Sequence, residues 1–212
     1  MKTVSSNPKD DLQAIRDIME RSSKFLSLSG LAGVFAGICA LAGAGFAWFG
    51  ILRSGQVAFP GSGTETTDPA VVEAGRYLVT DALVVLLLAF FGAVFLSFRK
   101  AKGAGQPLWT ATARRTLVHF LIPLATGGIF CFVLIERNLP GLVIPSTLIF
   151  YGLSLVNVGK FTFGELHYLG LIAICLGFLS VFLLPYGLLL WAIGFGVMHI
   201  VYGLVMHWRH ER

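Results

Sequence analysis

Few side chains in this sequence could carry a proton or bind a ligand, and one histidine has the most unusual position. His199 lies within a long apolar run, eight residues before His207. At 1.5 Å per helical residue it stands about 12 Å from the end of that run, near the midplane if the run crosses a bilayer. Burial there favours its neutral form. His199 therefore either belongs to a proton-linked or ligand-binding site, or is a structural residue bonded to a backbone carbonyl or to Ser154, Ser180 or Thr126.

Three further side chains could line the same polar interior. Tyr202 follows His199 at i+3, on the same helix face. His119 lies four residues before Pro123, which removes a bond to the carbonyl of His119 and breaks or kinks the helix there. Asp81 lies near the outer boundary of another apolar run. We interpret His199, His119, Tyr202 and Asp81 as a candidate intramembrane polar site, although a structural kink at His119 and ordinary rim polarity at Asp81 remain open alternatives.

Basic residues gather at the inner ends of neighbouring apolar runs. Arg114, Arg115 and Lys160 could bind a lipid phosphate there, or could be the ordinary positive rim of a membrane protein. His207 and His210 have a helical spacing that metal ligands can use, but they stand at a chain end, where fraying is common. We therefore predict a candidate lipid-phosphate rim and no metal site.

The sequence also lacks the short motifs that accompany catalysis. It contains no phosphate-binding glycine loop, no H-E-x-x-H, no C-x-x-C, no G-x-S-x-G and no dinucleotide fingerprint. The acids form no paired carboxylate site within the apolar runs. We expect no catalytic residues and no cofactor, and hence a protein that is not an enzyme.

The composition defines the class of protein that must position these residues. The chain has 212 residues, of which 56% are hydrophobic and only 13% are charged. A typical soluble domain carries about 25% charged residues, so this chain cannot cover a water-facing surface of its size. An ordinary soluble domain is excluded, and so is a basic tail that binds nucleic acid. The composition indicates an integral membrane protein.

Six apolar segments are long enough to cross a bilayer as helices. They cover residues 26–52, 77–98, 116–135, 142–159, 168–184 and 188–206. We predict an all-α integral membrane protein whose six transmembrane helices form three hairpins, preceded by an amphipathic helix. The expected divisions are an N-terminal helix over residues 1–25, the six-span domain over 26–206 and a cytoplasmic tail over 207–212.

The distribution of lysine and arginine predicts the orientation. With the N-terminus inside, 13 of the 16 basic residues lie on the inner side, and only Arg53, Arg76 and Arg137 lie outside. This arrangement predicts a multi-pass protein of the inner (plasma) membrane with both termini in the cytoplasm. It also accounts for the net charge of +5, so no nucleic-acid partner is needed.

The segment before the first span has a helical period of apolar residues. Residues 10–24 carry four acids and three bases, a net charge of −1. A helix that grips anionic lipid is usually basic. We favour docking of this helix against the inner face of the protein or against a partner helix, with a passive interfacial segment as the alternative.

Two stretches near the C-terminus repeat a pattern. Residues 150–159, which begin Phe150-Tyr151-Gly152, are similar to residues 194–203, and a glycine before a bulky pair precedes each, in Gly128-Ile129-Phe130 and Gly177-Phe178-Leu179. Mainly over residues 166–206, the chain resembles the HdeD-like family of small bacterial membrane proteins, built from three helical hairpins. The resemblance implies a role linked to acid stress and brings no catalytic motif. The long outer loop and the amphipathic N-terminal helix depart from that family's pattern.

Two functions remain for such a chain. The first is a non-enzymatic polytopic protein with an accessory, stress-related or scaffolding role, whose N-terminal helix contacts a protein partner. The alternative is a small transporter or channel with the midplane histidine lining the path. Small residues spaced four apart in the first span, such as Gly33 and Gly37, allow close helix contact, either within one bundle or between copies in a homo-oligomer.

Overall fold

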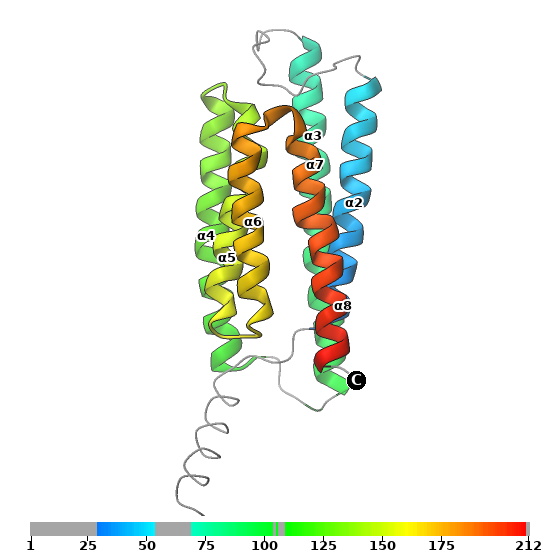
Figure 1. Cartoon of the computed structure of the whole chain (residues 1–212), viewed down its shortest axis with the longest axis vertical. Helices are drawn as coiled ribbons and strands as arrows, with labels where there is room; N and C mark the ends of the chain where they lie inside the picture. The colour runs from blue at the N-terminus through cyan, green and yellow to red at the C-terminus, as the bar shows by residue number, and fades with distance from the viewer. Residues whose placement is uncertain (1–28, 54–68, 104, 106–108, 211–212) are drawn as a thin grey trace, which may run out of the picture.

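The chain folds into long helices, several of which are interrupted or joined by short turns. The computed structural model describes residues 29–53, 69–103, 105 and 109–210 (Figure 1). The predicted amphipathic helix over residues 1–25 and the last two residues of the tail lie outside this part. All regular structure in the described ranges is helical, which confirms the all-α class. The long helices are α2 (Gly30–Arg53), α3 (Pro69–Gly103), α4 (Ala111–Glu136), α5 (Val143–Gly159) and α6 (Glu165–Phe182).

The last span is composite. The short helix α7 (Gly187–Trp191) runs into a π-helical segment, η3 (Ala192–Val197), and then into α8 (Met198–His210). Two 3₁₀ turns, η1 (Pro140–Leu142) and η2 (Leu184–Tyr186), reverse the chain before α5 and α7. Both turns contain a proline that the sequence places between apolar segments. Two residues before the first turn, Asn138 takes a positive φ of 57°, which asparagine tolerates better than most residues.

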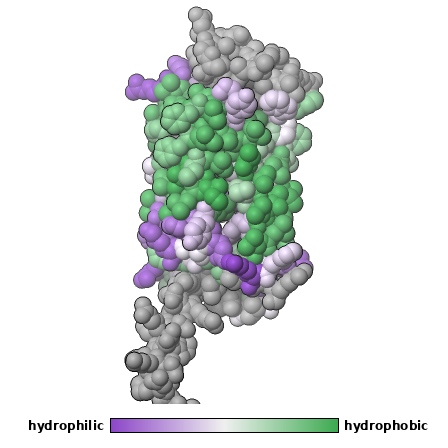
Figure 2. Space-filling model, in the orientation of Figure 1, coloured by the Kyte–Doolittle hydropathy of each residue, from purple (hydrophilic) through white to green (hydrophobic). Residues whose placement is uncertain are grey.

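Six helices in the described residues are long and apolar enough to cross a membrane, as predicted. They cover Gly30–Gly50, Gly75–Gly103, Ala111–Glu136, Pro140–Gly159, Glu165–Phe182 and Leu184–Arg209. Figure 2 shows a band of hydrophobic surface around the middle of the molecule, with hydrophilic residues gathered at its two ends. The chain is therefore a polytopic membrane protein with six spans.

The described helices pack in two groups of three spans. One group contains α4, α5 and α6, and α5 lies between the other two. The second contains α2, which packs against α3 on one side and against η3 and α8 on the other. The two groups stand side by side (Figure 1) and meet where the last span contacts α5 and α6. A hydrogen bond or ion pair across this junction would link the two groups.

Glycines bring two pairs of helices into backbone contact. A Cβ on Gly152 of α5 would lie 2.6 Å from the carbonyl oxygen of Gly170 on α6. A Cβ on Gly203 of α8 would lie 2.5 Å from the carbonyl oxygen of Gly30 on α2. Only glycine permits so close an approach, which strengthens packing between helices in lipid. Of the two uses foreseen for the small residues of the first span, the structure contains the one within the bundle.

Candidate functional site

The π-helical segment η3 brings a backbone carbonyl to the ring of His199. The ring atom Nδ1 lies 3.0 Å from the carbonyl oxygen of Gly194, five residues earlier. Because a carbonyl oxygen only accepts hydrogen bonds, Nδ1 must carry the proton and donate. The His199 side chain is 6% exposed, so this bond forms away from solvent. One of the two roles foreseen for His199, a buried residue bonded to a backbone carbonyl, is thus present in the structure.

The other ring nitrogen bonds across the junction between the two groups. The Tyr151 hydroxyl on α5 lies 2.6 Å from Nε2 of His199. Since Nδ1 holds the proton of a neutral imidazole, Nε2 is the acceptor and Tyr151 donates. Phe195 stacks against both rings, with centroid distances of 4.8 Å to Tyr151 and 6.0 Å to His199. His199 therefore uses both nitrogens inside an aromatic cluster and ties the last span to α5.

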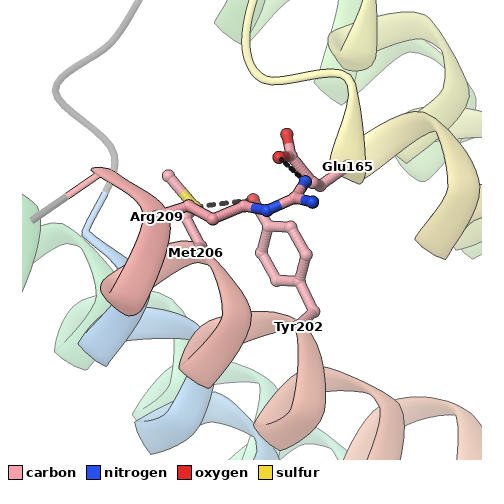
Figure 3. A network of polar contacts seen from close by, with 4 residues as sticks. All are labelled: Glu165, Tyr202, Met206 and Arg209. Atoms are coloured by element: carbon pink, nitrogen blue, oxygen red, sulfur yellow. Dashed lines mark hydrogen bonds and ion pairs between the residues drawn. The ribbon is translucent and has the colours of Figure 1, made fainter.

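Tyr202 makes a separate contact one turn closer to the C-terminus. Its hydroxyl donates to the sulfur of Met206 at 2.8 Å and makes no hydrogen bond to His199 within the described residues. Beside it, Arg209 Nη1 lies 3.2 Å from Glu165 Oε1 at the start of α6 (Figure 3). This ion pair is a second polar link between α8 and the α4–α6 group. It lies at the exposed end, since the Arg209 side chain is 68% exposed.

The other predicted members of the polar site lie elsewhere. His119 is exposed on α4 and stacks on Phe161, with ring centroids 4.8 Å apart. Helix α4 continues without a break from Ala111 to Glu136 through Pro123, so the broken helix expected at His119 is not there. Asp81 is half-buried on α3, facing Gly43 of α2. In the described part of the chain, no hydrogen bond joins His199, His119, Tyr202 and Asp81 to one another.

The basic rim residues are all solvent-accessible. Arg114 and Arg115 are exposed in the first two turns of α4, whose N-terminus is capped by the Thr110 hydroxyl, 3.0 Å from the Ala113 nitrogen. Lys160 is exposed at the end of α5. The turn that follows Lys160 contacts α4 through the Phe161–His119 stack, so two of the predicted rim segments are adjacent.

Sequence reasoning missed Tyr151 and the π-helical segment. A tyrosine within an apolar span needs a partner for its hydroxyl, and that requirement could have singled out Tyr151. No comparable signal marks Ala192–Val197 as π-helical, because Gly194 and Gly196 suit a close helix contact equally well. The sixth span contains a π-helical segment that the sequence did not predict, whereas α4 continues as one helix through Pro123.

Comparisons with known proteins add no relative to this picture: no protein family, no curated protein and no solved structure matches the chain. Among the described residues, no group of three or more histidine, cysteine or acidic side chains could hold a metal ion. The fold and the junction thus define an all-α six-span membrane protein with a histidine–tyrosine link between two helix groups.

Proposed function

We propose that this chain is a non-enzymatic component of the inner (plasma) membrane with an accessory, stress-related or scaffolding role, and with both termini in the cytoplasm. The observation that supports this proposal is the environment of His199. A histidine that relays protons or binds a ligand needs a ring nitrogen available to its substrate. Both nitrogens of His199 form hydrogen bonds, one with Gly194 and one with Tyr151. We therefore assign His199 a structural role, in which its bond to Tyr151 links the two helix groups.

A proton-flux assay tests this role directly. Full-length protein is reconstituted in liposomes, and acidification of the lumen is followed with a trapped dye under an imposed pH gradient. We expect the wild type and His199→Ala to leak no faster than liposomes without protein. His119→Ala is the matched control, because it removes an exposed histidine from another span. Flux that is above background in the wild type and lost only in His199→Ala would contradict the proposal.

The second candidate is a small transporter or channel with His199 lining its path. The π-helical segment favours it, since such segments are rare and occur often at functional sites. In that case the Tyr151–His199 bond would open during transport. The same flux assay, repeated with candidate small ions, separates this function from the first.

The proposed accessory role needs a partner, and the amphipathic segment before the first span is its best candidate. Its residues 10–24 have a net charge of −1, which suits a protein partner better than an anionic membrane. Deletion of residues 1–22 should abolish pull-down of partner proteins from native membranes. Undiminished pull-down would remove this segment from the proposal. The resemblance of residues 166–206 to the HdeD-like family motivates the stress-related form of the role.

A further inference from the structure

We propose that Arg115 and Lys160 form a binding site for the phosphate of an anionic phospholipid, in the leaflet where α4 begins and α5 ends. The inference is independent of the function proposed above. Its starting point is the contact between His119 and Phe161, whose ring planes lie 24° apart with centroids at 4.8 Å. This stack fixes the turn after α5 against the first part of α4.

The stack brings two cations to the same place. Arg115 precedes His119 by four residues, so the two lie one above the other on one face of α4. Lys160 immediately precedes Phe161 in the chain. Helical side chains tilt toward the N-terminus of their helix, so Arg115 leans toward the membrane surface rather than toward its centre. The two cations therefore flank the stacked rings from α4 and from the end of α5.

Neither cation is neutralised by the protein in the described residues. The Glu165 carboxylate, which lies in the same region of the chain, is paired with Arg209 on α8 at 3.2 Å. Arg115 and Lys160 are both exposed, and no ion pair involves either of them within the described ranges. Their charges are thus free to hold an external anion.

The surroundings indicate that this anion carries acyl chains. Trp109, exposed just before α4, is the kind of residue that marks the headgroup level of a bilayer. Ile122 lies two turns beyond Arg115 on the same face of α4 and is 59% exposed. A lipid that lay along this face would place its chains on Ile122 and its phosphate between the cations. A free phosphate would gain nothing from that apolar strip.

Arg114 provides an internal control. It has the same charge as Arg115, lies in the same turn and is also exposed, but its position is about 100° away around the helix axis. The flank of α4 that carries Arg114 is not the one that contacts Phe161. A specific site should therefore need Arg115 and not Arg114, whereas a diffuse positive rim would need both alike.

The test measures lipid retention by the full-length protein. Native mass spectrometry of the purified protein counts bound phosphatidylglycerol against phosphatidylcholine of the same chain length. We expect Arg115→Gln and Lys160→Gln each to lower the preference for phosphatidylglycerol about fivefold, since one cation near the surface contributes about 1 kcal/mol. The double variant should lose about 25-fold. Arg114→Gln should change the preference less than about twofold, and Lys160→Arg should retain it.

Three results would overturn the site. An equal loss in Arg114→Gln and Arg115→Gln would mean that general positive charge is responsible. A loss in Lys160→Arg as large as in Lys160→Gln would assign Lys160 a packing role rather than an electrostatic one. Displacement of the lipid by millimolar inorganic phosphate would show that the cations recognise a soluble anion instead. Retention that depends on Arg115 and Lys160 and resists inorganic phosphate would establish the lipid site.

Discussion

His119 in the third span and His199 in the sixth span have opposite environments, because the first is exposed and the second is buried. In α4, His119 is exposed and only stacks on Phe161, and the helix is continuous although Pro123 lies within it. In the sixth span, no proline lies between Gly187 and His210, yet the backbone is π-helical at η3 and His199 is buried with both nitrogens bonded.

In the sixth span, the irregular backbone coincides with one local hydrogen bond and one close contact with α2. In η3 the Gly194 carbonyl is needed by His199, and Gly196 lies so close to α2 that a Cβ on Gly37 would be 2.7 Å from its carbonyl oxygen. Proline is tolerated within transmembrane helices, and α4 continues through Pro123 as one helix.

The largest expected difference in stability is between the variants in which His199 or His119 is replaced by alanine. His199→Ala should lower the free energy of unfolding by about 2–3 kcal/mol, because it removes two membrane hydrogen bonds, each up to about 1.7 kcal/mol, and leaves a cavity. His119→Ala should cost less than about 0.5 kcal/mol, as is usual at exposed positions. Unfolding by sodium dodecyl sulfate in bicelles, followed by tryptophan fluorescence, measures both. Equal losses would remove the distinction between the two spans.

A second pair of variants compares glycines in the same two spans. Gly203→Ala should destabilise the protein by about 1–3 kcal/mol, because the new methyl group would meet the backbone of Gly30 and the nitrogen of Val34 at 2.5–2.6 Å. Gly128→Ala on α4 meets nothing within 4 Å, so we expect no loss or a small gain. The same unfolding titration applies. A loss in Gly128→Ala would imply that α4 has a tight neighbour outside this chain.

The sequence was informative where one physical requirement dominates. The need to bury about 20 apolar residues per crossing predicts all six spans. Residue counting also predicts a midplane position for His199, which is buried in the structure. The Tyr151 partner does not, because positions 48 residues apart are brought together only by the packing of α5 against the last span. The π-helical segment has the same origin.

A smaller effect is expected from Tyr151→Phe, which removes the bond across the junction and keeps the ring. The loss should be about 1 kcal/mol, close to one membrane hydrogen bond. Combined with His199→Ala it should add little, because both changes remove the same bond. A double-mutant cycle by the same titration tests this. Fully additive losses would mean that Tyr151 stabilises the protein without its bond to His199.

The smallest effect should follow Pro123→Ala. Since α4 is already a continuous helix, the change restores one backbone N–H that can bond to the His119 carbonyl. We expect a gain of about 0.6 kcal/mol, the mean value of a hydrogen bond in a membrane bundle. Thermal melting in detergent, with Leu121→Ala as an exposed control on the same helix, measures it. A loss above about 1 kcal/mol would show that the proline itself shapes the third span.

The packing of α2 against α8 has a consequence for biosynthesis. The first span is translated well before the glycines that receive it, among them Gly203. At typical elongation rates, the ribosome synthesises the second segment roughly 8–30 s after the first. During that interval, the surface of α2 that later contacts the α8 backbone must be covered by α3, by lipid or by an insertase. A polypeptide truncated before Met198 would lack α8 and would leave the α2 surface that α8 covers exposed to lipid, which makes it a natural target for quality-control proteases.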